Sequence, residues 1–443
     1  MNAIQQWLRE RNITEVECLI PDMTGNARGK IVPADKLSTE EGMRLPEGIF
    51  IQTVTGDWPV DQSAIDPAEI DMVLRPDPLT IRPVPWAAEP TAQIIHDCFD
   101  HGGQPHPLSP RNLLRRVLAL FAERGWQPVV APELEFFLVK QNLDPDYPLE
   151  PPVGRSGRPE TARQSYSIDA VNEFDPLFED IYDYCEAQEL NIDTLIHESG
   201  AAQMEINFLH GEALSLADQV FLFKRTVRET ALRHQIYATF MAKPMEREPG
   251  SSMHLHQSLI DAVTGANIFD ADGQPSALFK QFIAGQQKYL PAAMALLAPN
   301  VNSYRRIAKF ESAPINTHWG YDNRTVGLRV PIAAAAQTRV ENRLAGADAN
   351  PYLSMAASLA CGYLGIVEQL QPEAPLNGSA YEHPYGLPRS LEEALRLFGD
   401  CAALRDVLGE RFVDAYCAVK EAEYDAFSRV ISSWEREYLL LNV

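Results

Sequence analysis

Five short segments of the sequence alternate apolar side chains with side chains that can bind metal ions or phosphate. Residues two apart in a β-strand point to the same face, so Glu133 shares a face with Glu135, and His254 with His256. Alternation is also typical of a half-exposed strand, but the polar faces here carry Glu, His, Gln and Arg, and no Lys. The five segments are 133–136, 203–208, 253–259, 326–330 and 339–344.

These side chains are suited to divalent cations and polyphosphate. Mg²⁺ and Mn²⁺ take oxygen and imidazole ligands, a pair of metal ions can stabilise phosphoryl transfer, and arginine pairs with phosphate oxygens. Glu198, just before the second segment, adds a carboxylate. The sequence contains no GxxxxGK[ST] phosphate loop, no GxGxxG and no GxSxG motif. Any use of ATP would therefore depend on arginines and metal ions.

Two domains are expected to position these segments. Residues 1–104 contain short strand-like runs broken by Pro and Gly, at 16–20, 49–54 and 70–74. Ser109 followed by Pro110 predicts a helix N-cap and first position, with the helix running to about Arg124. We therefore place the domain boundary near residue 105, with a larger domain over 105–443.

The larger domain alternates strands with helical runs, which predicts an α+β fold. A proline-, glycine- and arginine-rich stretch at 144–160 is expected to be a long loop. Two further helices are expected after Ser390. The other helical runs lie near 173–189, 214–234, 276–297 and 350–370.

Composition narrows the class of protein. The 443 residues carry a formal net charge of −23, which makes nucleic acid a poor partner. No apolar run approaches the roughly 20 residues of a membrane span, and the first residues do not resemble a signal peptide. The six cysteines are scattered without a CxxC pair, which indicates free thiols in a reducing compartment. We expect a cytoplasmic enzyme with no membrane or nucleic-acid partner.

The motifs, in their order along the chain, resemble the glutamine synthetase family over nearly the whole sequence. The matching runs are DxxGxxRG at 22–29, ExE at 133–135, Glu198 with QMEIN at 203–207, KP with GSSMHLHQS at 243–258, NSY at 302–304, NRxxxxRxP at 323–331 and RxExR with ANPY at 339–352. The resemblance implies a small N-terminal β-grasp-like domain and a catalytic domain with a curved antiparallel sheet faced by helices. It also implies a homo-dodecamer of two hexameric rings.

The implied activity is an ATP-dependent, ADP-forming ligation of the γ-carboxylate of glutamate to an amine through γ-glutamyl phosphate. Two or more Mg²⁺ or Mn²⁺ ions per active site would assist it. By resemblance, one ion would be held by Glu135, Glu198 and Glu205. The second would be held by Glu133, His254 and Glu341.

The remaining roles also come from the resemblance. Arg306 and Arg343 would bind the glutamate carboxylates, with Gly250 allowing close backbone approach. The residues that would neutralise ATP phosphates during transfer are Arg324, Arg329 and Arg339. The nucleotide pocket would be lined by His256 and Ser258 together with Arg329 and Arg339.

The sequence departs from glutamine synthetase itself around the amine. The FDGSS run near the ammonium site is absent, the Glu that closes over ammonium aligns with Ser312 while Glu311 is one place off, and Pro249 replaces the Asn before the glycine. These changes resemble the γ-glutamylputrescine (γ-glutamylpolyamine) synthetase branch. They predict a primary amine, diamine or polyamine as nucleophile, and a role in polyamine and nitrogen metabolism. Candidate amine-pocket residues are Asp57, Trp58 and Asp61.

Three alternatives remain open. The chain could be a glutamine synthetase that uses ammonium, or a non-catalytic structural relative, which would be expected to lose metal ligands or phosphate arginines. A metal hydrolase could use a similar carboxylate–histidine site, but it would not need Arg324, Arg329 and Arg339 together.

Overall fold

The structure is a computed structural model that describes residues 3–37 and 42–443. After helix α1 (Ala3–Glu10), the N-terminal part forms a small sheet in the order β2-β1-β6-β4-β3, with β5 paired to β6. β1 and β6 are parallel and the other pairs are antiparallel. The strands are β1 (Glu15–Pro21), β2 (Ala27–Pro33), β3 (Met43–Pro46), β4 (Asp71–Pro76), β5 (Arg82–Pro83) and β6 (Thr91–Phe99).

Two of the three strands expected in this part are confirmed. The runs at 16–20 and 70–74 overlap β1 and β4, but the strand expected at 49–54 is wrong. Glu47–Ile51 forms a 3-10 helix, η2, which buries the successive residues Phe50 and Ile51 together. A strand would have sent these two side chains to opposite faces.

The large sheet follows the order β15-β16-β17-β12-β7-β9-β8, with β10 and β11 also paired to β7. Its paired strands are antiparallel except for the parallel pair β15–β16. The strands are β7 (Trp126–Lys140), β8 (Ile192–His197), β9 (Gln203–Phe208), β10 (Gly211–Glu212), β11 (Ile236–Thr239), β12 (Met253–Asp261), β15 (Trp319–Tyr321), β16 (Leu328–Val330) and β17 (Val340–Asn342). A two-stranded ribbon, β13 (Asp270–Ala271) with β14 (Gln274–Pro275), lies apart from this sheet.

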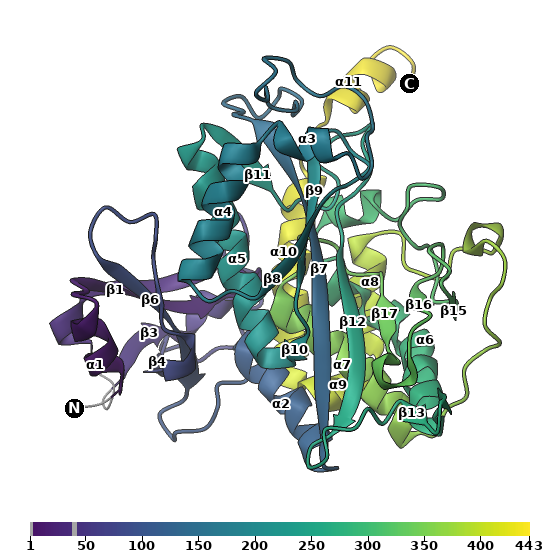
Figure 1. Cartoon of the computed structure of the whole chain (residues 1–443), viewed down its shortest axis with the longest axis horizontal. Coiled ribbons are helices and arrows are strands. Elements are labelled where there is room, and N and C mark those ends of the chain that lie inside the picture. Colours follow the sequence, from purple (N-terminus) through teal and green to yellow (C-terminus); the bar gives the residue numbers. More distant parts are fainter. Residues whose placement is uncertain (1–2, 38–41) are drawn as a thin grey trace.

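Helices cover one side of the large sheet, as Figure 1 shows for α5 and α7 behind β7 and β12. The expected N-cap is confirmed, because the Ser109 hydroxyl accepts from the Asn112 N–H at the start of α2. The long helices are α2 (Pro110–Ala122), α4 (Asp175–Ala187), α5 (Ala213–Arg233), α6 (Ala277–Leu297) and α7 (Pro351–Val367), with a short α3 (Ile168–Asn172). The expected loop at 144–160 contains none of these elements.

The end of the chain holds four helices where two were expected. They are α8 (Leu391–Asp400), α9 (Ala402–Leu408), α10 (Glu410–Ser428) and α11 (Ser433–Leu439). Cys401 is extended between α8 and α9, and Gly409 at φ 99° separates α9 from α10. A φ of this sign favours glycine. α11 projects from the body of the molecule (Figure 1).

One buried arginine joins the small sheet to the helices of the large domain. Arg111, at the start of α2, is 1% exposed and forms ion pairs with Asp77 and Asp97 near the small sheet and with Asp218 on α5. Asp218 also accepts from the Tyr352 hydroxyl on α7 at 2.7 Å. Breaking such a buried network strongly destabilises a protein, so these contacts keep the two parts in a fixed relation. The boundary at 104/105 stays a prediction.

The mixed α and β fold agrees with the expected class, including a small N-terminal sheet and a large sheet faced by helices. None of the helices in residues 3–37 and 42–443 combines the length and apolar character that a bilayer crossing needs.

Candidate active site

The pairing of four neighbouring strands brings five of the six predicted metal ligands together, and the sixth, Glu198, lies on the turn between β8 and β9. β7 lies between β9 and β12, and β17 lies beyond β12. The two-residue period of each strand directs the predicted ligands to one face of the sheet. Directly opposed pairs are Glu133 with His254, Glu135 with Glu205, and His256 with Glu341.

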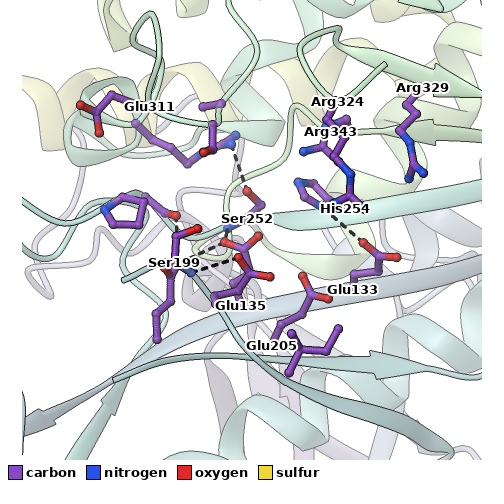
Figure 2. A pocket seen from close by; sticks show the side chains of 18 of the residues that line it. Glu133, Glu135, Ser199, Glu205, Ser252, His254, Glu311, Arg324, Arg329 and Arg343 are labelled. Carbon is purple, nitrogen blue, oxygen red and sulfur yellow. Dashed lines mark hydrogen bonds and ion pairs between the residues drawn. The ribbon is translucent and has the colours of Figure 1, made fainter. Parts of the chain in front are cut away.

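A cavity of about 560 Å³ opens on this face of the sheet. Figure 2 shows Arg324, Arg329 and Arg343 across the cavity from Glu135 and Glu205. An acidic side facing a basic side is an arrangement that can bind cations and phosphate oxygens together. Eleven predicted site residues line it: Glu133, Glu135, Glu198, Glu205, Gly250, His254, Arg306, Arg324, Arg329, Glu341 and Arg343.

A second cavity of about 400 Å³ adjoins the first and shares Glu133 and Asn207 with it. The other three predicted site residues, His256, Ser258 and Arg339, line this second cavity. Three of the four predicted nucleotide-binding residues therefore lie apart from the predicted glutamate-binding residues, while Arg329 lies in the first cavity.

Three of the carboxylates form an acidic cluster, Glu135, Glu198 and Glu205, and each is hard to ionise. Burial raises the pKa of all three side chains, and the neighbouring carboxylates raise the pKa of Glu135 and Glu205 further. Like charges in a buried site cannot all ionise without a compensating cation. Oxygen donors of this kind fit a hard divalent ion, so the acidic cluster fits the predicted metal.

Glu133 and Glu341 are instead compensated by the protein. Burial alone would raise the pKa of Glu133, but hydrogen bonds with His254 and His256 lower it, with His256 Nε2 at 2.8 Å from Glu133 Oε1. Burial alone would also raise the pKa of Glu341, but the charge of Arg343 lowers it. These two carboxylates are therefore ionised and already partnered.

Carboxylate and imidazole atoms within 4.8 Å of one another form two groups in the described part of the chain. One group is Glu133, His256 and Glu341, and the other is Glu133, Glu205 and His254. The two ligand sets predicted from the sequence group these residues differently from the distances. Which residues hold which metal ion stays a prediction.

Two buried arginines that line the first cavity each have one nitrogen without a hydrogen-bond partner among the described residues. Arg306 is 2% exposed and its Nη1 donates to the Ser252 hydroxyl at 3.2 Å. Arg306 Nε and Arg343 Nε are buried without a hydrogen-bond partner among the described residues. Both side chains line the cavity, and two guanidinium groups beside a cavity are suited to an anionic ligand.

Gly250 lies against Arg306. A Cβ at Gly250 would lie 2.3 Å from Arg306 Cγ and 2.6 Å from the Ala242 carbonyl oxygen. Both distances are shorter than any Cβ contact tolerates. Glycine is therefore required here to keep the arginine in place.

The edge of the first cavity is formed by a strained loop. Phe310 and Ser312 have φ of 65° and 63°, a region that costs a side-chain-bearing residue about 1–2 kcal/mol. Glu311 lies between them and pairs with Lys243, and Figure 2 shows its carboxylate apart from the acidic cluster.

Several lining residues were not among the predicted site residues, including Tyr166, Ser252, Phe310 and Tyr381. Tyr166 and Phe310 are 64% and 78% exposed, and both have positive φ. Neither lies in a periodic segment, so the sequence pattern did not mark them. The candidate amine-pocket residues Asp57, Trp58 and Asp61 are not among the residues of this chain that line the first cavity.

Comparison with protein families matches residues 107–439 to the catalytic domain of glutamine synthetase. The chain is 38% identical to gamma-glutamylputrescine synthetase PuuA from Escherichia coli, over 98% of this chain and 93% of that protein. It is 33% identical to a glutamate–isopropylamine ligase from a Pseudomonas species, over 98% of this chain and 96% of that protein.

A solved structure of similar shape is an ADP complex of GmaS. It has a TM-score of 0.86 and 28% sequence identity, and the match covers 99% of this chain and 100% of that one. The similarity therefore extends through the small N-terminal sheet as well as the large sheet.

Proposed function

The chain belongs to the glutamine synthetase family, and we propose that this ATP-dependent glutamate–amine ligase uses a primary amine, a class that includes diamines and polyamines, as its nucleophile. The names of two relatives, a γ-glutamylputrescine synthetase and a glutamate–isopropylamine ligase, support an amine with an alkyl chain.

The observation that carries the proposal is the composition of the cavity edge. Ser312 lines the first cavity, and by the family resemblance it aligns with the Glu that closes over ammonium. The neighbouring Glu311 pairs with Lys243. A small cation such as ammonium needs nearby anionic oxygens, whereas an alkylamine also gains from apolar contact. The exposed aromatic rings of Tyr166 and Phe310 line the same cavity and offer that contact.

The chemistry requires activation of glutamate before the amine attacks. A carboxylate is a poor electrophile, and transfer of the γ-phosphoryl group of ATP to the γ-carboxylate gives an acyl phosphate that an amine can attack with loss of phosphate. The protein contributes positioning and charge stabilisation, as in other phosphoryl transfers.

We assign the arginines to these steps. Arg306 and Arg343, which both line the first cavity, bind the carboxylates of glutamate. Arg324, Arg329 and Arg339 neutralise the phosphates of ATP, whose nucleoside part occupies the second cavity beside His256 and Ser258.

The acidic cluster, together with Glu133, His254 and Glu341, would hold two or more Mg²⁺ or Mn²⁺ ions. When bound, such ions neutralise charge on the transferred phosphoryl group. Without them, the raised pKa values of Glu135 and Glu205 keep protons on these two carboxylates at neutral pH.

We further propose a cytoplasmic homo-dodecamer of two hexameric rings that acts in polyamine and nitrogen metabolism. Exposed apolar side chains on α11 and after it support an assembly, with Trp434 60%, Leu440 75% and Leu441 90% exposed. Such a surface is typical of a protein interface. Light scattering of the full chain measures the mass of the assembly. A monomer at micromolar concentration would contradict the proposed dodecamer.

The test of the reaction is a set of parallel incubations of purified protein with ATP, Mg²⁺ and glutamate. Ammonium, putrescine, a longer polyamine or isopropylamine is added to each, phosphate release is followed, and products are identified by mass spectrometry. A γ-glutamyl-amine product with one amine preferred supports the proposal. Glutamine as the main product identifies a divergent glutamine synthetase, and ATP-independent turnover identifies a hydrolase.

A further inference from the structure

The last residues of the loop between β7 and α3 are fixed to the turn between β8 and β9. The Glu160 carboxylate accepts hydrogen bonds from His197 Nε2 at 3.0 Å and from the Ala202 backbone N–H at 2.7 Å. The Tyr166 backbone N–H donates to the His197 carbonyl oxygen at 2.8 Å. Glu198 lies on the turn between these contacts, so both of its flanks are held by the loop.

His197 connects Glu160 to the backbone of Glu198. The His197 side chain is fully buried and that of Glu160 is 8% exposed. The second ring nitrogen, Nδ1, lies 2.7 Å from the Glu198 carbonyl oxygen. Both ring nitrogens face oxygen acceptors, so both must donate. One imidazole therefore bridges a buried carboxylate and the main chain of a residue in the acidic cluster.

The position of the Glu198 carboxylate depends on this backbone. Its side-chain oxygen Oε2 accepts from the adjacent Ser199 N–H at 3.3 Å, a contact within the same turn. Burial raises the pKa of Glu198, and the positive charge of Arg324, across the cavity, lowers it in part. The turn itself must therefore direct the carboxylate into the cavity.

We propose that Glu160 is a positioning residue that, through His197, fixes the turn carrying Glu198 and thereby sets the affinity of the acidic cluster for a divalent cation. This rests on the proposed metal role of that cluster. Groups that orient a metal ligand through a direct hydrogen bond change metal affinity about 10- to 100-fold when removed. Glu160 acts one hydrogen bond further away, through His197, so we expect an effect at the lower end of this range.

The experiment measures Mn²⁺ binding to the full-length protein by isothermal titration calorimetry, without nucleotide, glutamate or amine. E160A is expected to weaken Mn²⁺ binding by about tenfold or more. E160Q keeps an oxygen acceptor for His197 and Ala202, and it should stay within about threefold of the parent. Because no amine is present, failure of this inference is separate from failure of the proposed reaction, which the amine series tests on the unaltered protein.

The chain offers a matched control on the same turn. Glu248 accepts from the Ala201 N–H at 3.0 Å and has a 20% exposed side chain, whereas the side-chain partners of His197 are Glu160 and the Glu198 carbonyl oxygen. E248A should leave Mn²⁺ affinity nearly unchanged. Equal losses in E160A and E248A, or parent affinity in folded E160A, would overturn the proposal. If E160A does not fold, E160D decides: its shorter side chain must weaken Mn²⁺ binding, and parent affinity would overturn the proposal.

Discussion

Lys243 Nζ lies 3.2 Å from Glu311 Oε2, so the carboxylate at the edge of the cavity already has a cation from its own chain. Lys243 is 10% exposed and also donates to the Glu248 carbonyl oxygen, which fixes the ammonium group. A carboxylate held in this way is less available to bind an incoming ammonium ion. The pair therefore supports the proposed use of an amine that binds through its alkyl part.

A carboxylate placed at Ser312 should shift the preference toward ammonium. Ser312 lines the cavity at φ 63°, and S312E would add an anionic oxygen where the amine enters while reducing the space for an alkyl chain. We expect the ratio of kcat/KM for ammonium to kcat/KM for the preferred amine to rise about tenfold, the effect of a difference of roughly 1.4 kcal/mol in barrier. Steady-state kinetics with both nucleophiles measure the ratio.

S312Q is the control for this change, because it adds similar volume without charge. It should lower turnover of the alkylamine without improving the use of ammonium. If both variants shift the ratio equally, volume and not charge determines the preference, and the argument from Ser312 is wrong.

Adding a methyl group at Gly250 should weaken glutamate binding. A Cβ there would lie 2.3 Å from Arg306 Cγ, so G250A must displace the arginine that we assign to glutamate. We expect KM for glutamate to rise at least about tenfold, and overpacking to cost about 1–3 kcal/mol of stability. Glutamate-dependent phosphate release and urea unfolding measure the two effects. G378A is a matched control, since a Cβ at Gly378 meets nothing within 4 Å.

Binding of a divalent cation should release protons. Burial and neighbouring carboxylates raise the pKa of Glu135 and Glu205, so these side chains hold protons near neutral pH when no cation is bound. A cation binds the ionised form, and its affinity should therefore rise with pH. Calorimetric titration with Mn²⁺ in buffers of different ionisation enthalpy measures the number of protons released.

E205Q should reduce this proton release, because the amide cannot ionise. The same raised pKa values also determine how these two carboxylates affect stability. Because their pKa values are higher in the folded than in the unfolded chain, Glu135 and Glu205 stabilise the folded state at low pH. This stabilisation is lost as the pH rises through the folded-state pKa values. Binding without any proton release at pH 7 would contradict the raised pKa values.

The face of the large sheet was predictable because its period is local. Glu133 and Glu135 are two residues apart on β7, and the same holds for His254 and His256 on β12. Any strand in these segments places each pair on one face. The nucleotide-pocket role of Arg339 came from the family resemblance and stays a prediction. The structure places Arg339 just before the three-residue strand β17.

Contacts between distant segments were not predictable in the same way. Tyr166 and Phe310 reach the cavity from loops, and their left-handed backbone leaves no pattern in the sequence. The bridge from Glu160 through His197 joins residues 37 positions apart, and only the folded chain brings them together. The strand expected at 49–54 failed for a related reason: packing of Phe50 and Ile51 determined a 3-10 turn over a run of β-type residues.

Lys224 should make the stability of the protein depend on pH in a defined direction. Burial lowers its pKa to about 7, with a smaller effect from the charge of Arg228, and its Nζ donates to the carbonyl oxygens of Ala347 and Ala349 at 2.6 and 2.8 Å. Between pH 7 and about 10 the unfolded chain holds a proton on this lysine that the folded chain does not, so the free energy of unfolding should rise with pH.

K224M should be less stable, because two carbonyl oxygens lose a donor, and its unfolding free energy should have a shallower pH dependence. Urea unfolding at pH 7.0, 7.75 and 8.5 for both proteins measures the difference in slope. Thiols with the ordinary pKa of about 8.5 ionise in the unfolded chains of both proteins, so their effect cancels in this difference. Parallel curves for the two proteins would mean that Lys224 is charged in the folded state and that its two hydrogen bonds compensate for burial.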